Sequence, residues 1–286
     1  MNGIHKITRE EYAAAPGVNN TQLSWAWKSL AHFAHYLQNP PEQTDAMADG
    51  ILIHQAVLEP DVFAAAVIAI PDDAPRRPTA MQLNAKKPSP ETIEAIEWWE
   101  SFNSRATGRT ILSPGKLQWI EDMAAAVLAD PFAAEILDAC TCREFAVFSR
   151  HGSTGLLLKS CMDAMTDGYG RIFDLKTTTN AEPEAYRRTV QDRGYHRAGA
   201  FYVDHFPRLG LGLTRPQFGH IVVEKEPPYV VSVRMFDEDS LQIGRLEYGA
   251  LLHKIANSQQ SGHFPGYDDG VGDTGLTFWK LKEVLR

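Results

Sequence analysis

Residues 157–178 read LLKSCMDAMTDGYGRIFDLKTT, and this stretch decides the fold. Two apolar, partly alternating runs flank a glycine-containing turn, which is the pattern of a β-hairpin. The pattern predicts antiparallel strands over 155–165 and 171–177. A third strand is expected over 143–150, because a further apolar run is separated from the hairpin by another glycine-rich turn. The centre of the chain therefore predicts a three-stranded antiparallel meander.

The hairpin carries the residues that point to chemistry. If its turn is centred in the middle of TDGYGR, Asp163 lies directly opposite Asp174 on the neighbouring strand. Side chains alternate along a strand, so Asp174 and Lys176 share a face while Leu175 points into the core. Lys159 shares the face of Asp163 by the same parity.

Two opposed carboxylates repel each other, and a divalent cation between them removes the repulsion. Oxygen ligands suit Mg²⁺ or Mn²⁺. Such an ion, with an ammonium group two residues along the strand, meets the needs of phosphodiester hydrolysis. The residues alone leave a second interpretation open, in which the two acids are solvated and the lysine is an exposed strand residue. A one-residue bulge in the hairpin would break the register.

The rest of the chain predicts helices around a sheet. The first third is mainly helical, and several helices begin at a capping residue followed by proline. The expected helices are 22–38, 45–59, 91–105, 115–129, a short one after Asp130-Pro131, 183–192, 195–206 and 237–256, with further strands at 218–224 and 229–236, and a long loop from 71 to 90. We therefore expect an α/β or α+β fold with a mixed central sheet flanked by helices and an N-terminal helical elaboration. A single domain is expected over 1–286, with a helical part (1–138) and a sheet core (139–286).

Composition limits the classes of partner. The chain has 286 residues and a formal net charge of −8, but residues 142–198 carry nine Lys/Arg against seven Asp/Glu. A polyanion would therefore be bound locally, in a cleft. We find no apolar run long enough for a membrane span and no signal-peptide pattern. Three cysteines are too few for an iron–sulfur site with four thiolates, so the cytoplasm is the expected location.

Several ordered motifs together resemble a known nuclease family. They are Gly50-Ile51-Leu52-Ile53-His54, Leu58-Glu59-Pro60, Lys159-Ser160-Cys161-Met162-Asp163, Asp174-Leu175-Lys176-Thr177-Thr178, Tyr195-His196 and Ala200-Phe201-Tyr202. The two acids and the lysine resemble the PD-(D/E)xK signature. The whole set, from about residue 19 to 225, is similar to the nuclease domain of the exonuclease VIII (RecE) family in the RecB-like branch of that superfamily.

The resemblance implies a restriction-endonuclease-like core and a magnesium-dependent exonuclease. Such an enzyme digests the 5′-ended strand of linear duplex DNA and leaves 3′ single strands for recombination by an annealing recombinase. Relatives of this kind are often encoded in prophages and can form rings around DNA. By position, His54, Asp163 and Asp174 would bind the metal, with the Leu175 carbonyl as a further ligand. Lys176 would be the catalytic lysine.

His54 and a set of polar residues complete the candidate site. Gly50 lies one turn before His54, where a small residue would let the imidazole approach a neighbouring sheet; a nitrogen ligand also suits Mn²⁺ better than Mg²⁺. The alternative for His54 is ordinary packing. The candidate DNA contacts are Lys159, Thr177, Thr178, Arg193, Tyr195 and Tyr202, and the two tyrosines could equally pack the core.

One position departs from the family pattern. The RecB-like motif Q-x-x-x-Y ends at Tyr202, and Ala198 stands where the glutamine is expected. This leaves open a catalytically weak or inactive module that binds DNA ends or a partner protein. A metallohydrolase for small phosphoesters is a third and weaker hypothesis, because the chain lacks a glycine-rich phosphate loop.

Overall fold

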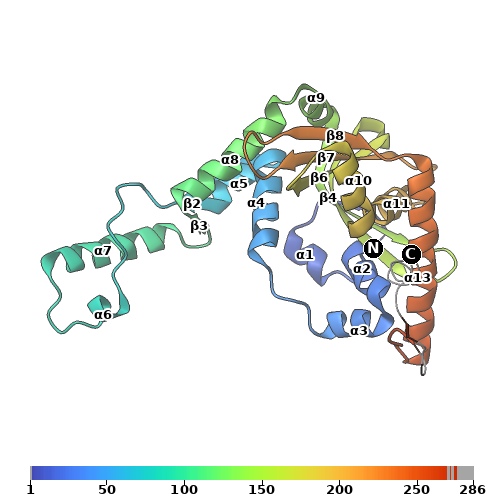
Figure 1. Ribbon diagram of the computed structural model, residues 1–286, viewed down its shortest axis with the longest axis horizontal. Helices are drawn as coiled ribbons and strands as arrows, with labels where there is room; N and C mark the ends of the chain where they lie inside the picture. The colour runs from blue at the N-terminus through green and yellow to red at the C-terminus, as the bar shows by residue number, and fades with distance from the viewer. Residues whose placement is uncertain (1, 269–270, 272–273, 276–286) are drawn as a thin grey trace, which may run out of the picture.

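A six-stranded mixed sheet forms the centre of the protein (Figure 1). The computed structural model describes residues 2–268, 271 and 274–275. The strand order is β1-β4-β5-β6-β7-β8, and only the β6–β7 pair is parallel. These strands are β1 (Gly3–His5), β4 (Cys140–Arg150), β5 (Leu157–Thr166), β6 (Arg171–Thr178), β7 (Gln217–Glu224) and β8 (Val231–Met235). The expected antiparallel meander is confirmed as β4-β5-β6.

Helices cover both faces of the sheet. One face packs against α2 (Asn20–Lys28), α3 (Leu30–Gln38), α11 (Tyr195–Val203), α12 (His205–Arg208) and α13 (Glu238–Ser261). The other packs against α4 (Asp45–Leu58), α5 (Pro60–Ala66), α8 (Pro114–Ala129) and α9 (Pro131–Ala139). Residues that alternate along β6 enter the two cores in turn, since Ile172 belongs to the first and Phe173 to the second. The expected mixed sheet between helices is confirmed.

The predicted helices form, two of them divided into shorter helices, and α1 (Arg9–Ala14), α5 and α6 (Ala80–Leu83) are helices that were not predicted. The helix expected over 22–38 is two helices, because the chain is extended at Ser29 and the Ser29 hydroxyl accepts a hydrogen bond from the backbone N–H of His32 at 3.2 Å. The segment 195–206 likewise divides between α11 and α12. The expected loop 71–90 contains the short helix α6 (Ala80–Leu83). No helix of the described residues is long and apolar enough to cross a bilayer.

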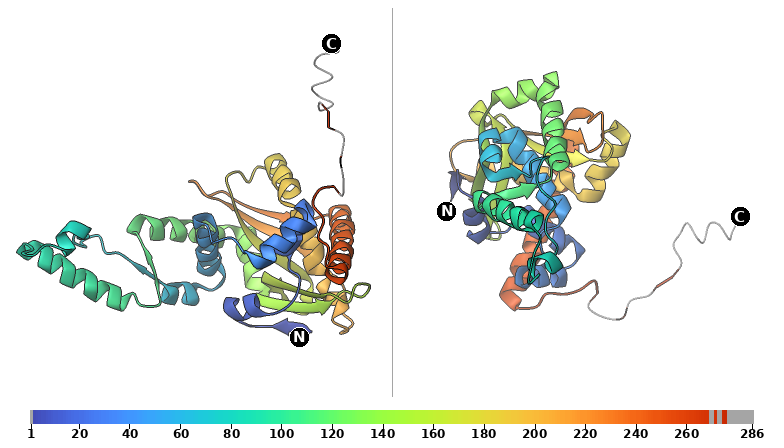
Figure 2. Two further views of the ribbon diagram at one scale, coloured as in Figure 1. Left: turned by 90° about the horizontal axis from the view of Figure 1, so that it is seen from below. Right: turned by 90° about the vertical axis from the view of Figure 1, so that its left-hand side faces the viewer.

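An extension projects from this body on the side of α4 and α5 (Figures 1 and 2). Its base is a small parallel sheet of β2 (Val67–Ala69) and β3 (Thr110–Leu112), which the sequence did not predict. Beyond it lies α7 (Pro90–Arg105), whose Trp99 indole donates a hydrogen bond to the Pro75 carbonyl at 3.0 Å. Remaining helices are α1 (Arg9–Ala14) and α10 (Pro183–Arg193).

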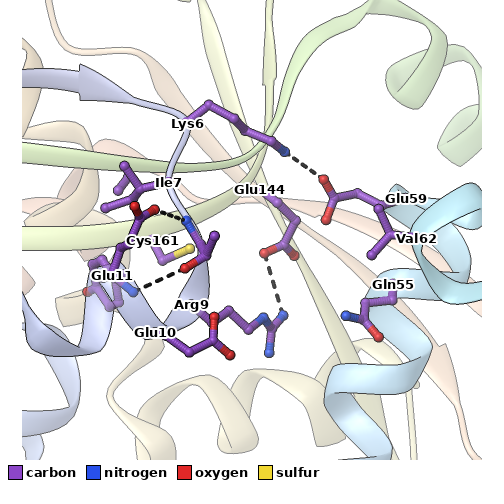
Figure 3. Close-up of a pocket in the computed structure, with 13 residues that line it drawn as sticks. Lys6, Ile7, Arg9, Glu10, Glu11, Gln55, Glu59, Val62, Glu144 and Cys161 are labelled. Atoms are coloured by element: carbon purple, nitrogen blue, oxygen red, sulfur yellow. Dashed lines mark hydrogen bonds and ion pairs between the residues drawn. The ribbon is translucent and has the colours of Figure 1, made fainter. Parts of the chain in front are cut away.

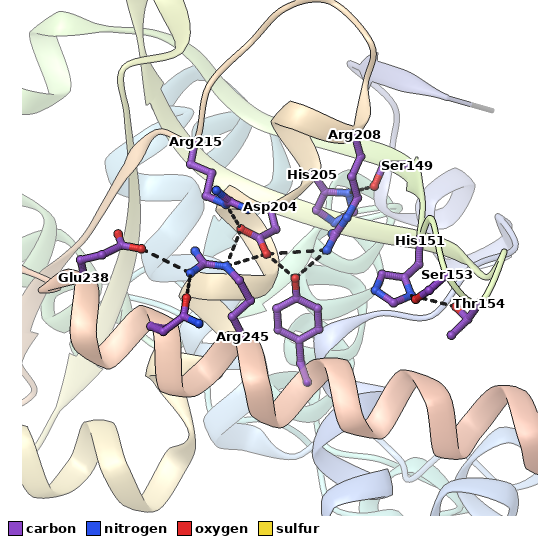
Figure 4. A network of polar contacts seen from close by, with 12 residues as sticks. Ser149, His151, Ser153, Thr154, Asp204, His205, Arg208, Arg215, Glu238 and Arg245 are labelled. Atoms are coloured by element: carbon purple, nitrogen blue, oxygen red, sulfur yellow. Dashed lines mark hydrogen bonds and ion pairs between the residues drawn. The ribbon is translucent and has the colours of Figure 1, made fainter.

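A network of polar contacts joins β4 to the α11–α13 layer (Figure 4), and its member His205, which is buried, also contacts β5. The His205 imidazole lies between the hydroxyls of Ser149 and Ser160, 2.8 Å from each. Burial, and secondarily the Arg208 guanidinium, lowers the pKa of His205 to about 3. The folded protein therefore holds this imidazole neutral.

Protonation of His205 is expected to make the fold sensitive to acid. The unfolded chain takes up this proton near pH 6.5 and the folded chain only near pH 3, so the contribution to stability is complete above pH 6.5 and is lost as the pH falls from 6.5 towards 3. The expected loss is up to about 1.4 kcal/mol per pH unit. Urea unfolding at a series of pH values measures it.

A His205→Gln variant should show a shallower pH dependence, and His263→Gln, which changes an exposed histidine, should not. Equal slopes for the wild type and His205→Gln would contradict this account.

Candidate metal centre

The predicted hairpin register is observed where strands β5 and β6 pair. Ala164 pairs with Phe173 and Met165 with Ile172, so Asp163 and Asp174 are next in the same register. The ladder ends there. The Leu175 N–H donates a hydrogen bond of 2.6 Å to the Asp163 carboxylate and not to a backbone carbonyl of β5. The two strands therefore separate at the acidic residues, and the Asp163 side chain occupies the fork.

Glu144 is a third acid at this point, and the sequence analysis missed it. Glu144 lies on β4 between the pairs Arg143–Ala164 and Phe145–Met162, which places it opposite Asp163. Its φ of 46° is unusual for a non-glycine residue and marks a local distortion of the strand. Counting residues across the preceding turn at 151–156, as was done for the β5–β6 turn, would have found this pairing.

His54 completes a group that can hold a metal ion. It lies on α4, and its Nδ1 is 3.3 Å from Asp163 Oδ2 and 3.9 Å from Glu144 Oε1. His54, Glu144 and Asp163 each offer a ligand atom within 4.8 Å of the others. The Glu144 Oε1 atom is buried and has no hydrogen-bond partner among the described residues. An unsatisfied buried carboxylate oxygen facing an imidazole and a second carboxylate fits a divalent cation.

The approach of His54 does not depend on Gly50. A Cβ atom built at Gly50 would meet nothing within 4 Å, so the reason given for this glycine is wrong. The imidazole reaches the acids because α4 packs against the sheet face that carries Ala164 and Leu175.

Asp174 and Lys176 form a neighbouring ion pair. The Lys176 ammonium contacts Asp174 Oδ2 and lies 5.5 Å from the centre of the Tyr195 ring. Asp174 is buried, whereas a quarter of the Lys176 side chain is exposed. Asp174 does not belong to the three-residue group of His54, Glu144 and Asp163. The predicted residues thus fall in two adjoining groups, one that could hold a metal ion and one that contains the lysine.

The acids differ in how readily they ionise. Burial, followed by repulsion from Asp163, raises the pKa of Glu144 to about 7. Burial likewise raises the pKa of Asp174 to about 6, against the opposing effect of the Lys176 charge. Burial also disfavours ionised Asp163, but the charge and hydrogen bond of His54 outweigh it and hold the pKa of Asp163 well below its usual range. Asp163 is therefore the acid of the group whose ionised form the fold favours most.

A cavity of about 410 Å³ opens beside Glu144 (Figure 3). The segment between β1 and α1 forms one wall, and Gln55 and Glu59 line the opposite one. Arg9 extends across it to Glu144, with 3.5 Å between the guanidinium Nη2 and Oε2. This arginine partly offsets the acidic charge of the site.

The candidate DNA contacts are placed unequally. Lys159 is buried and its ammonium donates to the carbonyls of Tyr12, Ala13 and Ala15 at 2.6–3.2 Å. These bonds use all its N–H groups, so we do not retain Lys159 as a DNA contact. Tyr202 packs against the main core, with its ring centre 6.0 Å from that of Phe218.

The other four candidate DNA contacts lie at the carboxyl end of β6 and in the segments that follow it in the chain. Thr178 exchanges hydrogen bonds of 3.1 and 3.3 Å with the backbone of Asn180, and Thr177 is half-buried beside it. Arg193 is exposed at the end of α10, and Tyr195 begins α11 next to Lys176. Thr177 and Thr178 thus continue the strand that carries Lys176, and Tyr195 lies beside the lysine.

Comparisons with known proteins agree with this fold. A search of curated proteins gives no match. The crystal structure of a "putative exonuclease" from Eubacterium rectale is similar, with a TM-score of 0.55 and 12% identity over 97% of this chain and 98% of that one. At this identity the likeness shows the fold alone. Residues 23–271 match the model of the PDDEXK-like domain of unknown function (DUF3799). The match covers most of the chain, and the sheet, helices and acidic fork fit the same description, so the chain belongs to this PDDEXK-like nuclease-fold family.

Proposed function

We propose that the protein is a divalent-metal-dependent DNA exonuclease. The observation that carries the proposal is the meeting of His54, Glu144 and Asp163 beside the Asp174–Lys176 pair at a fork in the sheet. His54, Glu144 and Asp163 would hold Mg²⁺ or Mn²⁺, with Asp174 and the Leu175 carbonyl as further ligands. A bound ion supplies polarisation of a phosphoryl oxygen and a more acidic water.

The chain's own residues supply positioning and charge. Although burial disfavours the ammonium form, Asp174 and Asp163 raise the pKa of Lys176, so the side chain stays positively charged. From its partly exposed position this charge can offset the negative charge that builds on a phosphate in the transition state. In an extended strand the N–H and C=O of one residue point to the same side, so the Leu175 carbonyl is expected to face the fork together with its N–H.

The remaining features of the proposal rest on the sequence resemblance. They are digestion of the 5′-ended strand of linear duplex DNA, 3′ overhangs for an annealing recombinase, ring assembly and a role in prophage recombination, as in the exonuclease VIII (RecE) family. Thr177, Thr178, Arg193 and Tyr195 are the DNA contacts we retain. We also propose that residues 1–286 form one domain, because α4 supplies His54 to the site on the sheet. The three free cysteines suit the cytoplasm, which we propose as the location.

Ala198 supports a second candidate function, a DNA-end-binding module with little or no cleavage. This residue occupies the position of the family glutamine and is buried on α11. The module would bind DNA with a strong salt dependence. It would release no nucleotides, and Ala198→Gln would be expected to restore cleavage.

We expect the wild-type protein to degrade linear duplex DNA when Mg²⁺ or Mn²⁺ is present and to stop when the metal is chelated. Substrates labelled at the 5′ or the 3′ end, with a covalently closed circle of the same sequence as control, report strand choice and the need for an end. Loss of 5′ label from linear DNA with an intact circle is the expected result. Salt-sensitive binding without any loss of label would instead favour the binding module.

A further inference from the structure

A buried histidine stands directly behind Asp174. His220 lies on β7, opposite Asp174 in the parallel register of β6 and β7. Its imidazole is inaccessible to solvent. Nε2 is 3.6 Å from Asp174 Oδ2, and Nδ1 is 2.7 Å from the hydroxyl of Tyr186 on α10. Tyr186, His220 and Asp174 thus form a continuous row that leads into the candidate metal centre.

The surroundings of His220 leave it few other partners. Four aromatic rings enclose the imidazole with centroids 4.8–6.0 Å away, and they belong to Tyr186, Tyr195, Phe218 and Phe236. Nε2 makes no hydrogen bond to any described residue. The nearby Asp174 carboxylate is therefore the polar group that this nitrogen faces.

The Tyr186 hydroxyl selects the tautomer of the imidazole. The ring is shielded from solvent and enclosed by aromatic side chains, an environment that favours the neutral imidazole with its single N–H. If Tyr186 donates its O–H to Nδ1, the ring hydrogen is on Nε2 and points towards the carboxylate. The other tautomer would turn a nitrogen lone pair towards Asp174 and leave the tyrosine hydrogen without an acceptor in an aromatic environment.

We propose that His220 is a positioning residue for Asp174, with its tautomer set by Tyr186, an inference that rests on the proposed nuclease function. In the structure Asp174 contacts Lys176 on one side and faces His220 Nε2, 3.6 Å from its Oδ2, on the other. When Lys176 turns to a DNA phosphate, His220 remains to orient the carboxylate towards the ion. Outer partners of this kind orient metal ligands and commonly change metal affinity or activity by 10–100-fold when removed.

The experiment compares Mn²⁺ dissociation constants, measured by calorimetry, for His220→Leu, His220→Gln and Tyr186→Phe. We expect His220→Leu to weaken Mn²⁺ binding by about 10–100-fold. His220→Gln carries an N–H donor at a similar reach and should restore affinity to within about threefold of the wild type. Tyr186→Phe removes one oxygen and should weaken binding by up to about tenfold, with kcat for DNA cleavage reduced more than KM.

Tyr248→Phe is the matched control. Its hydroxyl is also buried and bonded to side chains, those of Asp204 and Arg208, but away from the candidate site. The Tyr248→Phe variant should have an altered thermal stability and an unchanged affinity for Mn²⁺. If Tyr186→Phe behaves in the same way, or if His220→Leu binds Mn²⁺ like the wild type, the positioning role is wrong.

The same measurements separate this inference from the proposed function. Unchanged Mn²⁺ affinity in the variants of a wild-type protein that cuts DNA would overturn the role of His220 and leave the nuclease intact. A wild-type protein that binds Mn²⁺ and cuts no DNA would overturn the function, while the order of the dissociation constants would still decide the role of His220. Should His220→Leu fail to fold, Tyr186→Phe and His220→Gln provide the test.

Discussion

Lys176→Ala is expected to reduce the rate of DNA cleavage by about a thousandfold, the scale of loss when one preorganised charged group is removed from a transition state. The ammonium contacts the buried Asp174 and is itself partly exposed, so its charge is available to a phosphate. Metal binding should persist, because the variant keeps His54, Glu144 and Asp163. Single-turnover cleavage of end-labelled duplex, with Mn²⁺ affinity measured in parallel, checks both statements.

Lys116→Ala is the matched control for this variant. Lys116 also pairs with an aspartate, Asp49, and lies over an aromatic ring, Trp119, but it belongs to α8 and not to the acidic fork. Its loss should leave the cleavage rate within about twofold, as expected for an ion pair near the surface. Cleavage by Lys176→Ala at the wild-type rate would refute the assignment of Lys176 as the catalytic lysine.

Glu144→Gln is expected to stabilise the metal-free protein by roughly 1–3 kcal/mol and to remove most of its affinity for Mn²⁺. Burial and Asp163 raise the pKa of Glu144 to about 7, so its ionised form is unfavourable in the fold. The sign follows from linkage: the wild type loses stability as the pH rises from the ordinary glutamate value of 4.5 through 7, and the glutamine variant does not. Thermal melting between pH 5 and 8, with and without Mn²⁺, measures both effects.

Asp163→Asn provides the contrast. This carboxylate accepts the Leu175 N–H and pairs with His54, interactions that favour its charged form. Its loss should lower metal-free stability by about 1.5–3 kcal/mol, the usual range for a hydrogen bond to a charged group. If both variants shift the melting temperature in the same direction, the two acids do not differ in the way proposed.

Local pattern was enough to predict the meander and its register. The hairpin turn and the alternation of apolar residues set the pairing of Ala164 with Phe173, and Asp163 and Asp174 follow as the next pair. These are contacts between residues close in sequence, where turn length and side-chain alternation leave few choices. The helix boundaries near proline and capping residues were predictable for the same reason, whereas the break at Ser29 was not.

The tertiary structure decided which groups meet. Glu144, Asp163 and His54 come from three elements, and their spacing in the sequence does not predict that α4 packs against the fork. Strand alternation predicts that Lys159 shares the face of Asp163, yet its ammonium donates hydrogen bonds to three carbonyls of the N-terminal segment. His220 reaches Asp174 because β7 joins β6 in parallel, a pairing between strands separated by three helices. The amino-acid sequence by itself therefore determined the central strands and the positions of Asp163, Asp174 and Lys176 on them, since these depend on local geometry. Only the packing of distant elements decided the ligand set and the groups that support it, because burial and charge at a site depend on what the whole chain brings around it.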